Sequence, residues 1–194
     1  FKTPAFLILL FYFAIPSLPG WGIKNWLPTL FSENLHIGMD IAGPISTIAI
    51  AASSLLGVLL GGILSDKWVQ QNFKGRMYTS AIGLALTIPS LLIIGYGQTL
   101  FHFVAAAVCF GIGYGMFDAN SMPILCQFVK PNQRATGYGF LNTAGIFAGA
   151  LITDYLGRST DAGNLGKDFA MLAFVVVIVL VIQLIFLKPK TNHA

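Results

Sequence analysis

The sequence predicts an all-α membrane protein with six transmembrane helices, and two observations lead to this prediction. Of the 194 residues, 56% are hydrophobic and only 9% are charged, whereas soluble domains carry about 25% charged residues. Six apolar runs also reach the length of roughly 20 residues that is needed to cross a bilayer. This composition excludes most soluble enzymes. The net charge of +4 is typical of basic cytoplasmic loops, so it indicates no nucleic-acid partner.

The six predicted spans follow one another with short connections, which leave no room for a soluble domain. They cover residues 6–31, 42–64, 77–96, 100–126, 135–156 and 169–187. The first span contains three prolines, and the fourth contains several glycines and Pro123. We expect these two spans and the fifth to be interrupted, which membranes tolerate where protein or a watery cavity satisfies the freed backbone groups. When six spans are divided three plus three, spans one and four occupy equivalent positions, as in transporter binding sites.

The remaining spans predict how the helices pack. The last span has a single polar residue, Gln183, and we expect this helix to face lipid. Glycines four residues apart allow close approach between membrane helices. Such pairs occur in the second, fourth and fifth spans, which are therefore predicted to pack together as a bundle: Gly57 and Gly61, Gly111 and Gly115, Gly145 and Gly149.

No cofactor or metal site is predicted. Cys109 and Cys126 lie about 25 Å apart if their apolar run is one helix, which is too far for a disulfide, so we expect buried free thiols. The histidines are too scattered to ligate a metal together. They are His36, His102 and His193.

The basic residues outside the spans gather at one end of a six-span arrangement. Eight lie at that end: Lys2, Lys67, Lys74, Arg76, Lys130, Arg134, Lys188 and Lys190. The opposite end carries Arg158 and Lys167. Because Lys and Arg accumulate on the cytoplasmic side, we expect both termini in the cytoplasm, in a bacterial inner membrane. The chain begins with Phe1 and not with Met, which we interpret as the beginning of a fragment.

The connection between the second and third spans carries the most specific pattern. The segment GGILSDKWVQQNFKGRM follows the order G-x-x-x-D-(R/K)-x-x-G-(R/K), with several extra residues in its second part. It resembles the signature loop of the major facilitator superfamily, which follows the second helix of each six-helix half on the cytoplasmic face. The matching residues are Gly62, Asp66, Lys67, Gly75 and Arg76. The resemblance assigns them, together with Arg134, to the signature loop and the gate.

Two further segments are similar to organic-anion and organophosphate transporters of this superfamily. Residues 22–33 (GIKNWLPTLFSE) resemble the first helix of the C-terminal half, and residues 134–137 (RATG) match the start of its fifth helix. The resemblance implies the C-terminal half of a twelve-helix transporter, with 3+3 inverted repeats and alternating access. Its partners would be the missing N-terminal half, the lipid bilayer, a small-molecule substrate and a coupling ion, H+ or Na+. Gly20 replaces an Arg that organophosphate antiporters carry at this position, which disfavours phosphate esters.

Lys24 and Asp118 are ionisable residues inside spans, where a charge costs about 2.5–3.5 kcal/mol and therefore indicates function. Lys24, with Trp21 and Asn25 beside it, is predicted to hold an organic anion or a sugar acid. Alternatively, Lys24 extends to the outer surface. Asp118 is either a proton-coupling carboxylate or a structural partner of Arg134 or a helix end. Their positions along the spans predict no direct salt bridge between Lys24 and Asp118.

Further polar residues within the spans are candidates to line the substrate cavity. Tyr114, Asn120 and Asn142 are predicted to bind substrate, and Asn142 ranks first because it lies near mid-span between small residues. Alternatively, such residues join two helices by hydrogen bonds worth about 0.6 kcal/mol each. No catalytic residue is predicted.

Two other functional classes are alternatives to a transporter fragment. An intramembrane aspartyl protease requires Tyr-Asp and Gly-x-Gly-Asp sequences, whereas Asp118 and Asp154 follow Phe and Thr, and no Gly-x-Ser-Gly run supports a serine protease. A six-helix half-transporter or channel that assembles with itself remains the alternative to the fragment. The sequence therefore favours a secondary active transporter of a small polar solute over an enzyme.

Overall fold

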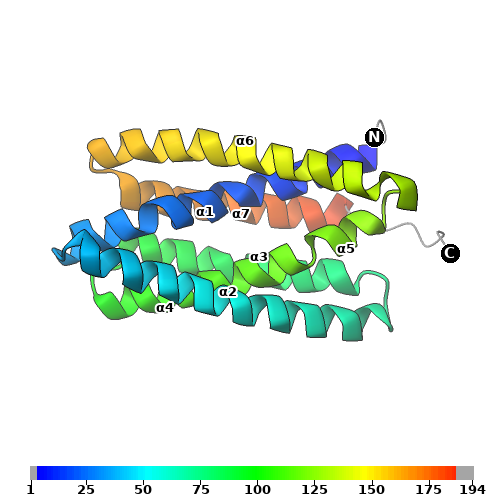
Figure 1. The fold of residues 1–194 in the computed structure, drawn as a ribbon, viewed down its shortest axis with the longest axis horizontal. Helices are drawn as coiled ribbons and strands as arrows, with labels where there is room; N and C mark the ends of the chain where they lie inside the picture. The colour runs from blue at the N-terminus through cyan, green and yellow to red at the C-terminus, as the bar shows by residue number, and fades with distance from the viewer. Residues whose placement is uncertain (1–3, 187–194) are drawn as a thin grey trace.

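The computed structural model describes residues 4–186, and the fold within this range consists of helices and their connections (Figure 1). The sequence analysis also made predictions that involve residues outside the described range, namely Phe1, Lys2, Leu187, Lys188, Lys190 and His193. The helices are α1 (Pro4–Leu35), α2 (Met39–Val69), α3 (Gly75–Tyr96), α4 (Leu100–Ala119), α5 (Ser121–Cys126), η1 (Pro131–Gln133), α6 (Arg134–Asp161) and α7 (Leu165–Phe186).

Six segments are long and apolar enough to cross a membrane, which confirms the predicted fold class. They are Phe6–Leu35, Met39–Val69, Gly75–Tyr96, Leu100–Cys126, Pro131–Asp161 and Leu165–Phe186. Most of the helices extend beyond the predicted spans, because polar residues near the helix ends continue the last turns. The chain is therefore an integral membrane protein with six helical spans.

The expected interruptions of the first and fifth spans are wrong, because α1 and α6 are continuous, whereas the fourth span is interrupted as predicted. Helix α1 continues through Pro16, Pro19 and Pro28. The Ser17 hydroxyl donates to the Phe13 carbonyl of the same helix at 2.8 Å, an additional hydrogen bond beside Pro16. The fourth span breaks between α4 and α5, with Pro123 in the first turn of α5, where a missing N–H costs little.

The predicted bundle of the second, fourth and fifth spans is only half right. Helices α2 and α4 do pack closely, because Gly57 and Gly61 of α2 face the backbone of Ile112 and Met116. The fifth span, α6, instead packs along α1 (Figure 1). Its glycines face α1, with Gly145 against Ser17 and Gly149 against Trp21. A glycine pair indicates a close neighbour but does not identify which helix that neighbour is.

The helices pair as two repeats of three spans each. Span one packs on span five as span four packs on span two, and span one packs on span six as span four packs on span three. Spans three and six also pack on each other. Exchanging the first three spans with the last three therefore leaves the pattern of contacts unchanged, as expected for two structural repeats.

Helix α7 faces lipid on only one side. Phe174 and Ile178 are exposed, whereas Phe169 and Val176 are buried against the neighbouring helices. Gln183 is also buried, and its amide donates to the Met77 carbonyl of α3 at 2.8 Å. The single polar residue of this span therefore joins two helices, which corrects the prediction of a wholly lipid-facing helix.

Both cysteines are free and half-buried.

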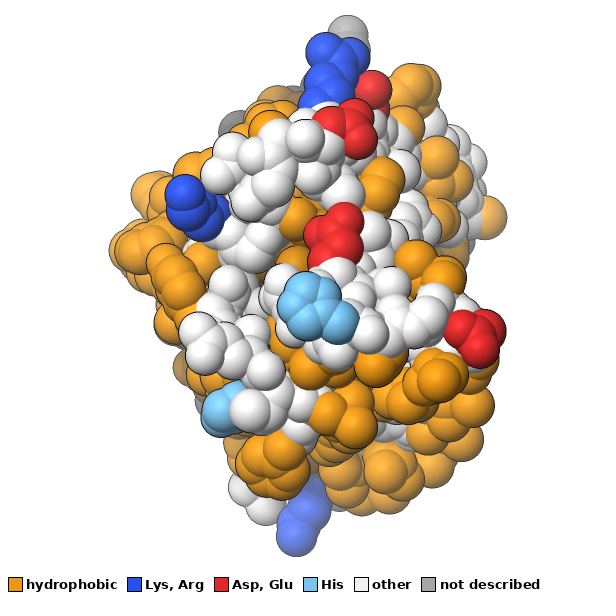
Figure 2. All heavy atoms as spheres, turned by 90° about the vertical axis from the view of Figure 1, so that its left-hand side faces the viewer, with side chains coloured by type: hydrophobic (Ala, Val, Ile, Leu, Met, Phe, Trp, Pro, Cys, Tyr) orange, Lys and Arg blue, Asp and Glu red, His pale blue; other side chains and the backbone are white. Residues whose placement is uncertain are grey.

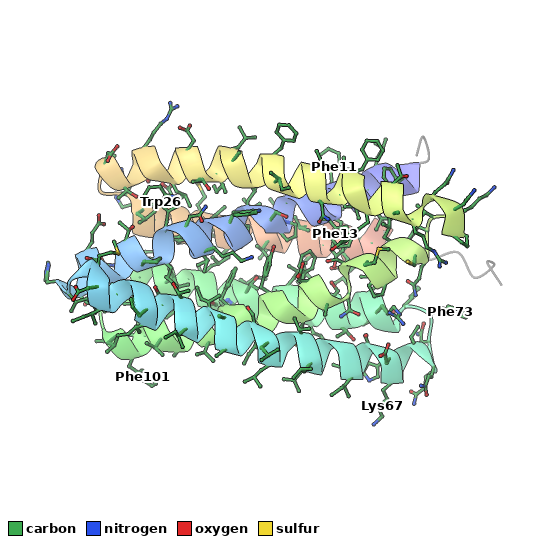
Figure 3. All side chains as sticks on the ribbon, in the orientation of Figure 1. Phe11, Phe13, Trp26, Lys67, Phe73 and Phe101 are labelled. Atoms are coloured by element: carbon green, nitrogen blue, oxygen red, sulfur yellow. The ribbon has the colours of Figure 1, made fainter. Side chains whose placement is uncertain are left out.

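Most of the basic residues of the described chain lie at one end of the bundle, namely Lys67, Lys74, Arg76, Lys130 and Arg134. The start of α1, the end of α7 and the α2–α3 connection lie together at the right of Figure 1. Lys67 and Phe73 mark this end in Figure 3. The opposite end, which faces the viewer in Figure 2, mixes basic, acidic and histidine side chains. The charge asymmetry read from the sequence is thus an asymmetry between the two ends of one bundle.

Candidate functional site

Two neighbouring cavities meet at three side chains, those of Lys24, Tyr114 and Asp118. The first cavity, of about 360 Å³, lies among α1, α2 and α4. The second, of about 280 Å³, lies among α1, α4 and α6. Helices α1 and α4 hold equivalent places in the two repeats, so the repeat brings the ionisable residues of both spans to one site.

Lys24 lines both cavities from the second half of α1. Its ammonium nitrogen lies 5.6 Å from the ring centroid of Trp21 and 5.9 Å from that of Tyr114. Both distances allow a cation–π interaction. Among the described residues Lys24 has no ion-pair partner, because the ion pairs there join Arg76 to Asp66 and Arg158 to Asp154. The ammonium is therefore held by aromatic rings and keeps its charge available to a ligand.

Asp118 lies on α4 and lines the same two cavities. Its carboxylate interacts electrostatically with Lys24, but the two form no direct ion pair within the described chain. Asp118 does not pair with Arg134 either, since that guanidinium donates to the Cys126 carbonyl at 3.4 Å. A cation and an anion thus face one space without neutralising each other by direct contact.

Of the six predicted substrate-binding residues, four line the cavities and two do not. Lys24 is one of the four. Trp21 and Asn142 line the second cavity, and Tyr114 lines both. Asn25 instead donates to the Thr153 hydroxyl at 2.9 Å and joins α1 to α6. Asn120 is fully buried at the α4–α5 break, where its amide donates to the Met116 carbonyl at 2.9 Å.

Several cavity residues were not predicted from the sequence. They are recognised by the helix face that they share and not by polarity near the middle of a span. Ser17, Trp21, Lys24 and Pro28 share one face of α1, since they recur every three or four residues. The same spacing connects Tyr138 to Asn142 on α6. It also groups residues of α2 that line the first cavity: Thr47, Ala51, Ser54 and Val58. Helical periodicity from Lys24 would have found Ser17.

The cavity residues are suited to binding. An ammonium, aromatic faces, an amide and hydroxyl groups converge on one mainly apolar and one mainly polar cavity, and such combinations are found in small-molecule sites. Within residues 4–186, no group of three or more His, Cys, Asp or Glu side chains is placed to hold a metal ion.

The α2–α3 connection has the contacts that its pattern predicts, except at one glycine. Asp66 accepts a hydrogen bond from Arg76 at 3.3 Å. A Cβ on Gly75 would lie 2.6 Å from the backbone of Trp68, so this glycine lets α3 start beside the end of α2. Gly62 faces no atom of the described chain within 4 Å. The close contact with α4 is made by Gly61 instead.

The ion pair between Arg76 and Asp66 is expected to contribute little to stability. The Asp66 side chain is 69% exposed, and exposed ion pairs contribute about 0.2–1 kcal/mol. A double-mutant cycle with Arg76→Gln and Asp66→Asn, followed by thermal unfolding in detergent, should give a coupling energy in that range. A coupling energy several times larger would mean that the pair is desolvated by contacts other than those described.

Comparison with known proteins gives relatives that are named as transporters. The chain is 25% identical over 170 residues to "Probable anion transporter 5" of Arabidopsis thaliana, covering 77% of this chain and 38% of the relative. It is 26% identical over 132 residues to a voltage-gated purine nucleotide uniporter of Homo sapiens, covering 66% and 29%. An MFS-type efflux pump of Mycolicibacterium smegmatis is 24% identical over 186 residues, covering 92% and 43%. The chain spans less than half the length of each relative.

Solved structures show the same fold. A POT family transporter, in complex with a thioalcohol-conjugated peptide, superposes with a TM-score of 0.77 at 16% identity, covering 93% of this chain and 37% of the other. A D-xylose-proton symporter superposes with a TM-score of 0.66 at 20% identity, covering 95% and 48%. The likeness extends over nearly the whole described bundle.

A family model gives the most extensive match. The model described as Major Facilitator Superfamily matches residues 5–194. This match agrees with the signature residues of the α2–α3 connection, with the six helical spans and with the relatives, which are transporters and not enzymes. The chain belongs to the major facilitator superfamily, and it forms one six-helix half of that fold.

Proposed function

We propose that the chain is part of a secondary active transporter that moves a small organic anion by alternating access, coupled to an ion. The main support is that the Lys24 ammonium lines two cavities and has no ion-pair partner among the described residues. A cation in that state favours an anionic ligand, because charge-assisted hydrogen bonds are stronger than neutral ones. The names of an anion transporter and a nucleotide uniporter among the relatives support an anion.

Each cavity residue then has a role that follows from its place. Lys24 binds the anion, with Trp21 and Tyr114 holding its ammonium and offering stacking faces. Asn142 makes no hydrogen bond within the described chain, so its amide is available to substrate. Asp118 binds and releases the coupling proton. Asn25 and Asn120 act indirectly, by joining α1 to α6 and by supporting the α4–α5 break.

A second six-helix half is proposed to close the open side of the two cavities. Trp21, Lys24, Asp118 and Asn142 are exposed in this chain although they line cavities, which suits a site completed by another half. We place the end with Lys67 and Arg134 in the cytoplasm, with both termini there, because basic residues accumulate on that side. The α2–α3 connection and Arg134 then belong to the inner gate, in a bacterial inner membrane.

Replacing Asp118 tests the proposed coupling. In proteoliposomes that contain the full-length protein, Asp118→Asn should abolish accumulation of labelled carboxylates driven by a pH gradient. Exchange of the same compounds at equal pH should continue, because the anion site at Lys24 is intact. Asp154→Asn is the control, since Asp154 pairs with Arg158 and lines neither cavity. Unchanged accumulation by Asp118→Asn would exclude Asp118 as the coupling residue.

A further inference from the structure

The two cavities that meet at Lys24 differ in the chemistry of their walls. In the second cavity, the Tyr138 hydroxyl and the Asn142 amide make no hydrogen bond within the described chain, so both are available to a ligand. The first cavity is bounded by apolar side chains of α1 and α2, namely Pro28, Ile50, Ala51 and Val58. A ligand bound at Lys24 thus has polar groups on its α6 side and mainly apolar groups on its α2 side.

Most of the polar atoms near the first cavity do not alter this difference. The Ser46 hydroxyl donates to the Ala42 carbonyl of its own helix at 2.7 Å, so it has no donor left for a ligand. Thr47 and Ser54 are the other hydroxyl side chains that α2 contributes to this cavity. Their hydroxyls make no hydrogen bond within the described chain, so this wall offers a ligand two free hydroxyls among the carbon groups of Pro28, Ile50, Ala51 and Val58. Apart from the shared residues Lys24, Tyr114 and Asp118, the wall is therefore mostly carbon.

We infer that the anion proposed to bind Lys24 carries an aryl or alkyl group, which occupies the cavity between α1, α2 and α4, and that it is not a polyhydroxylated sugar acid. The inference rests on the proposed function, in which Lys24 holds the anionic group. It deepens that function by naming the class of substrate: a monocarboxylate with one apolar end and one end that hydrogen-bonds to Tyr138 or Asn142.

The size of the cavity and the cost of desolvation support this class. An apolar cavity of about 150 Å³ already holds benzene, and the first cavity measures about 360 Å³. An aromatic ring placed there gains free energy in proportion to the apolar area it buries. Thr47 and Ser54 offer only two hydroxyls on this wall, so most hydroxyls of a sugar acid would lose water against Ile50 and Val58 without finding partners, which is unfavourable.

The electrostatics of the site favour the substrate, and not a side chain of another helix, as the occupant. The first cavity opens onto the ammonium of Lys24 and the carboxylate of Asp118, which have no direct ion-pair partner in the described chain. An apolar side chain covering both would remove two charges from water that form no direct ion pair, which is unfavourable. An organic anion instead brings a counter-charge for Lys24 together with its apolar group.

The test measures ligand-induced stabilisation of the purified full-length protein by its melting temperature, since ligands that bind the native state raise it. Four probes separate charge from apolarity: phenylacetate, acetate, gluconate and the neutral 2-phenylethanol. Ala51→Phe fills the first cavity, whereas Ala52→Phe adds the same side chain one residue further, outside both cavities. Val58→Thr keeps the shape of the side chain but makes this wall polar, so it remains informative if Ala51→Phe fails to fold.

Phenylacetate should raise the melting temperature at concentrations where acetate, gluconate and 2-phenylethanol do not. Ala51→Phe should weaken phenylacetate binding at least tenfold and Val58→Thr severalfold, while Ala52→Phe leaves it unchanged. Gluconate binding that equals phenylacetate binding and depends on Lys24 would overturn the inference and leave the proposed function standing. Phenylacetate binding that survives Ala51→Phe would also overturn it. If no organic anion stabilises the protein in a Lys24-dependent way, the proposed function itself fails.

Discussion

Replacing Lys24 by alanine is expected to lower the affinity for organic anions by about 10- to 100-fold. Hydrogen bonds to charged groups contribute about 1.5–3 kcal/mol, and each 1.4 kcal/mol corresponds to about a tenfold change in affinity. The loss should apply to every carboxylate tested, whatever its apolar part, because the ammonium interacts with the shared anionic group. Isothermal titration of the purified full-length protein, with the carboxylate that binds most tightly, measures the change.

Two variants separate the charge of Lys24 from other effects of the substitution. Lys24→Arg keeps a cation near Trp21 and Tyr114 and should retain part of the binding. Lys167→Ala removes an exposed lysine whose ammonium donates to Asn164 at 3.4 Å and which lines neither cavity, so binding should not change. Wild-type affinity in Lys24→Ala would place the anion elsewhere in the protein.

Replacing Gly61 by alanine is expected to destabilise the protein by about 1–3 kcal/mol, the usual cost of overpacking. A Cβ at this position would lie 2.7 Å from the Cα of Met116 in α4, and backbone atoms cannot move aside as a flexible side chain can. Helices α2 and α4 would have to separate, which would also disturb the cavity between them. Thermal or denaturant unfolding in detergent, compared with wild type, measures the loss.

The adjacent glycine provides the matched control. A Cβ on Gly62 meets no described atom within 4 Å, so Gly62→Ala should leave stability unchanged or raise it slightly, because alanine favours helix more than glycine does. If the two variants were equally stable, the close contact between α2 and α4 would not depend on Gly61. If Gly62→Ala were the less stable variant, that face of α2 would contact a segment outside the described chain.

Hydropathy and charge made the coarse architecture predictable. Runs of apolar residues must form helices in a bilayer, because the backbone has no water to bond with, and this alone yields six spans. Charge repelled from the hydrocarbon region places most basic residues at one end of the bundle and makes Lys24 and Asp118 stand out within it. The break before Pro123 was predictable as well, since proline removes a backbone donor.

Local sequence patterns were insufficient wherever a structural feature depended on packing against another helix. Proline in α1 predicts a break, but α1 packs along α6 and α7 and stays continuous. Gly145 and Gly149 indicate a close contact, yet only the arrangement of the helices shows that the contact is with α1. Gln183 reads as a lone polar residue in a lipid-facing helix until the Met77 carbonyl is found beside it.

The sequence by itself determined the family, the six spans and the two charged residues, because these depend on composition, motif order and the cost of placing a charge in lipid. Only the tertiary structure decided which polar residues share a cavity. Lys24 and Asn25 are adjacent in the chain, but one residue turns the side chain by about 100° around a helix. Lys24 therefore lines both cavities, while Asn25 bonds to Thr153. A side chain's direction within the bundle is set by helix packing, and packing depends on residues far apart in the sequence.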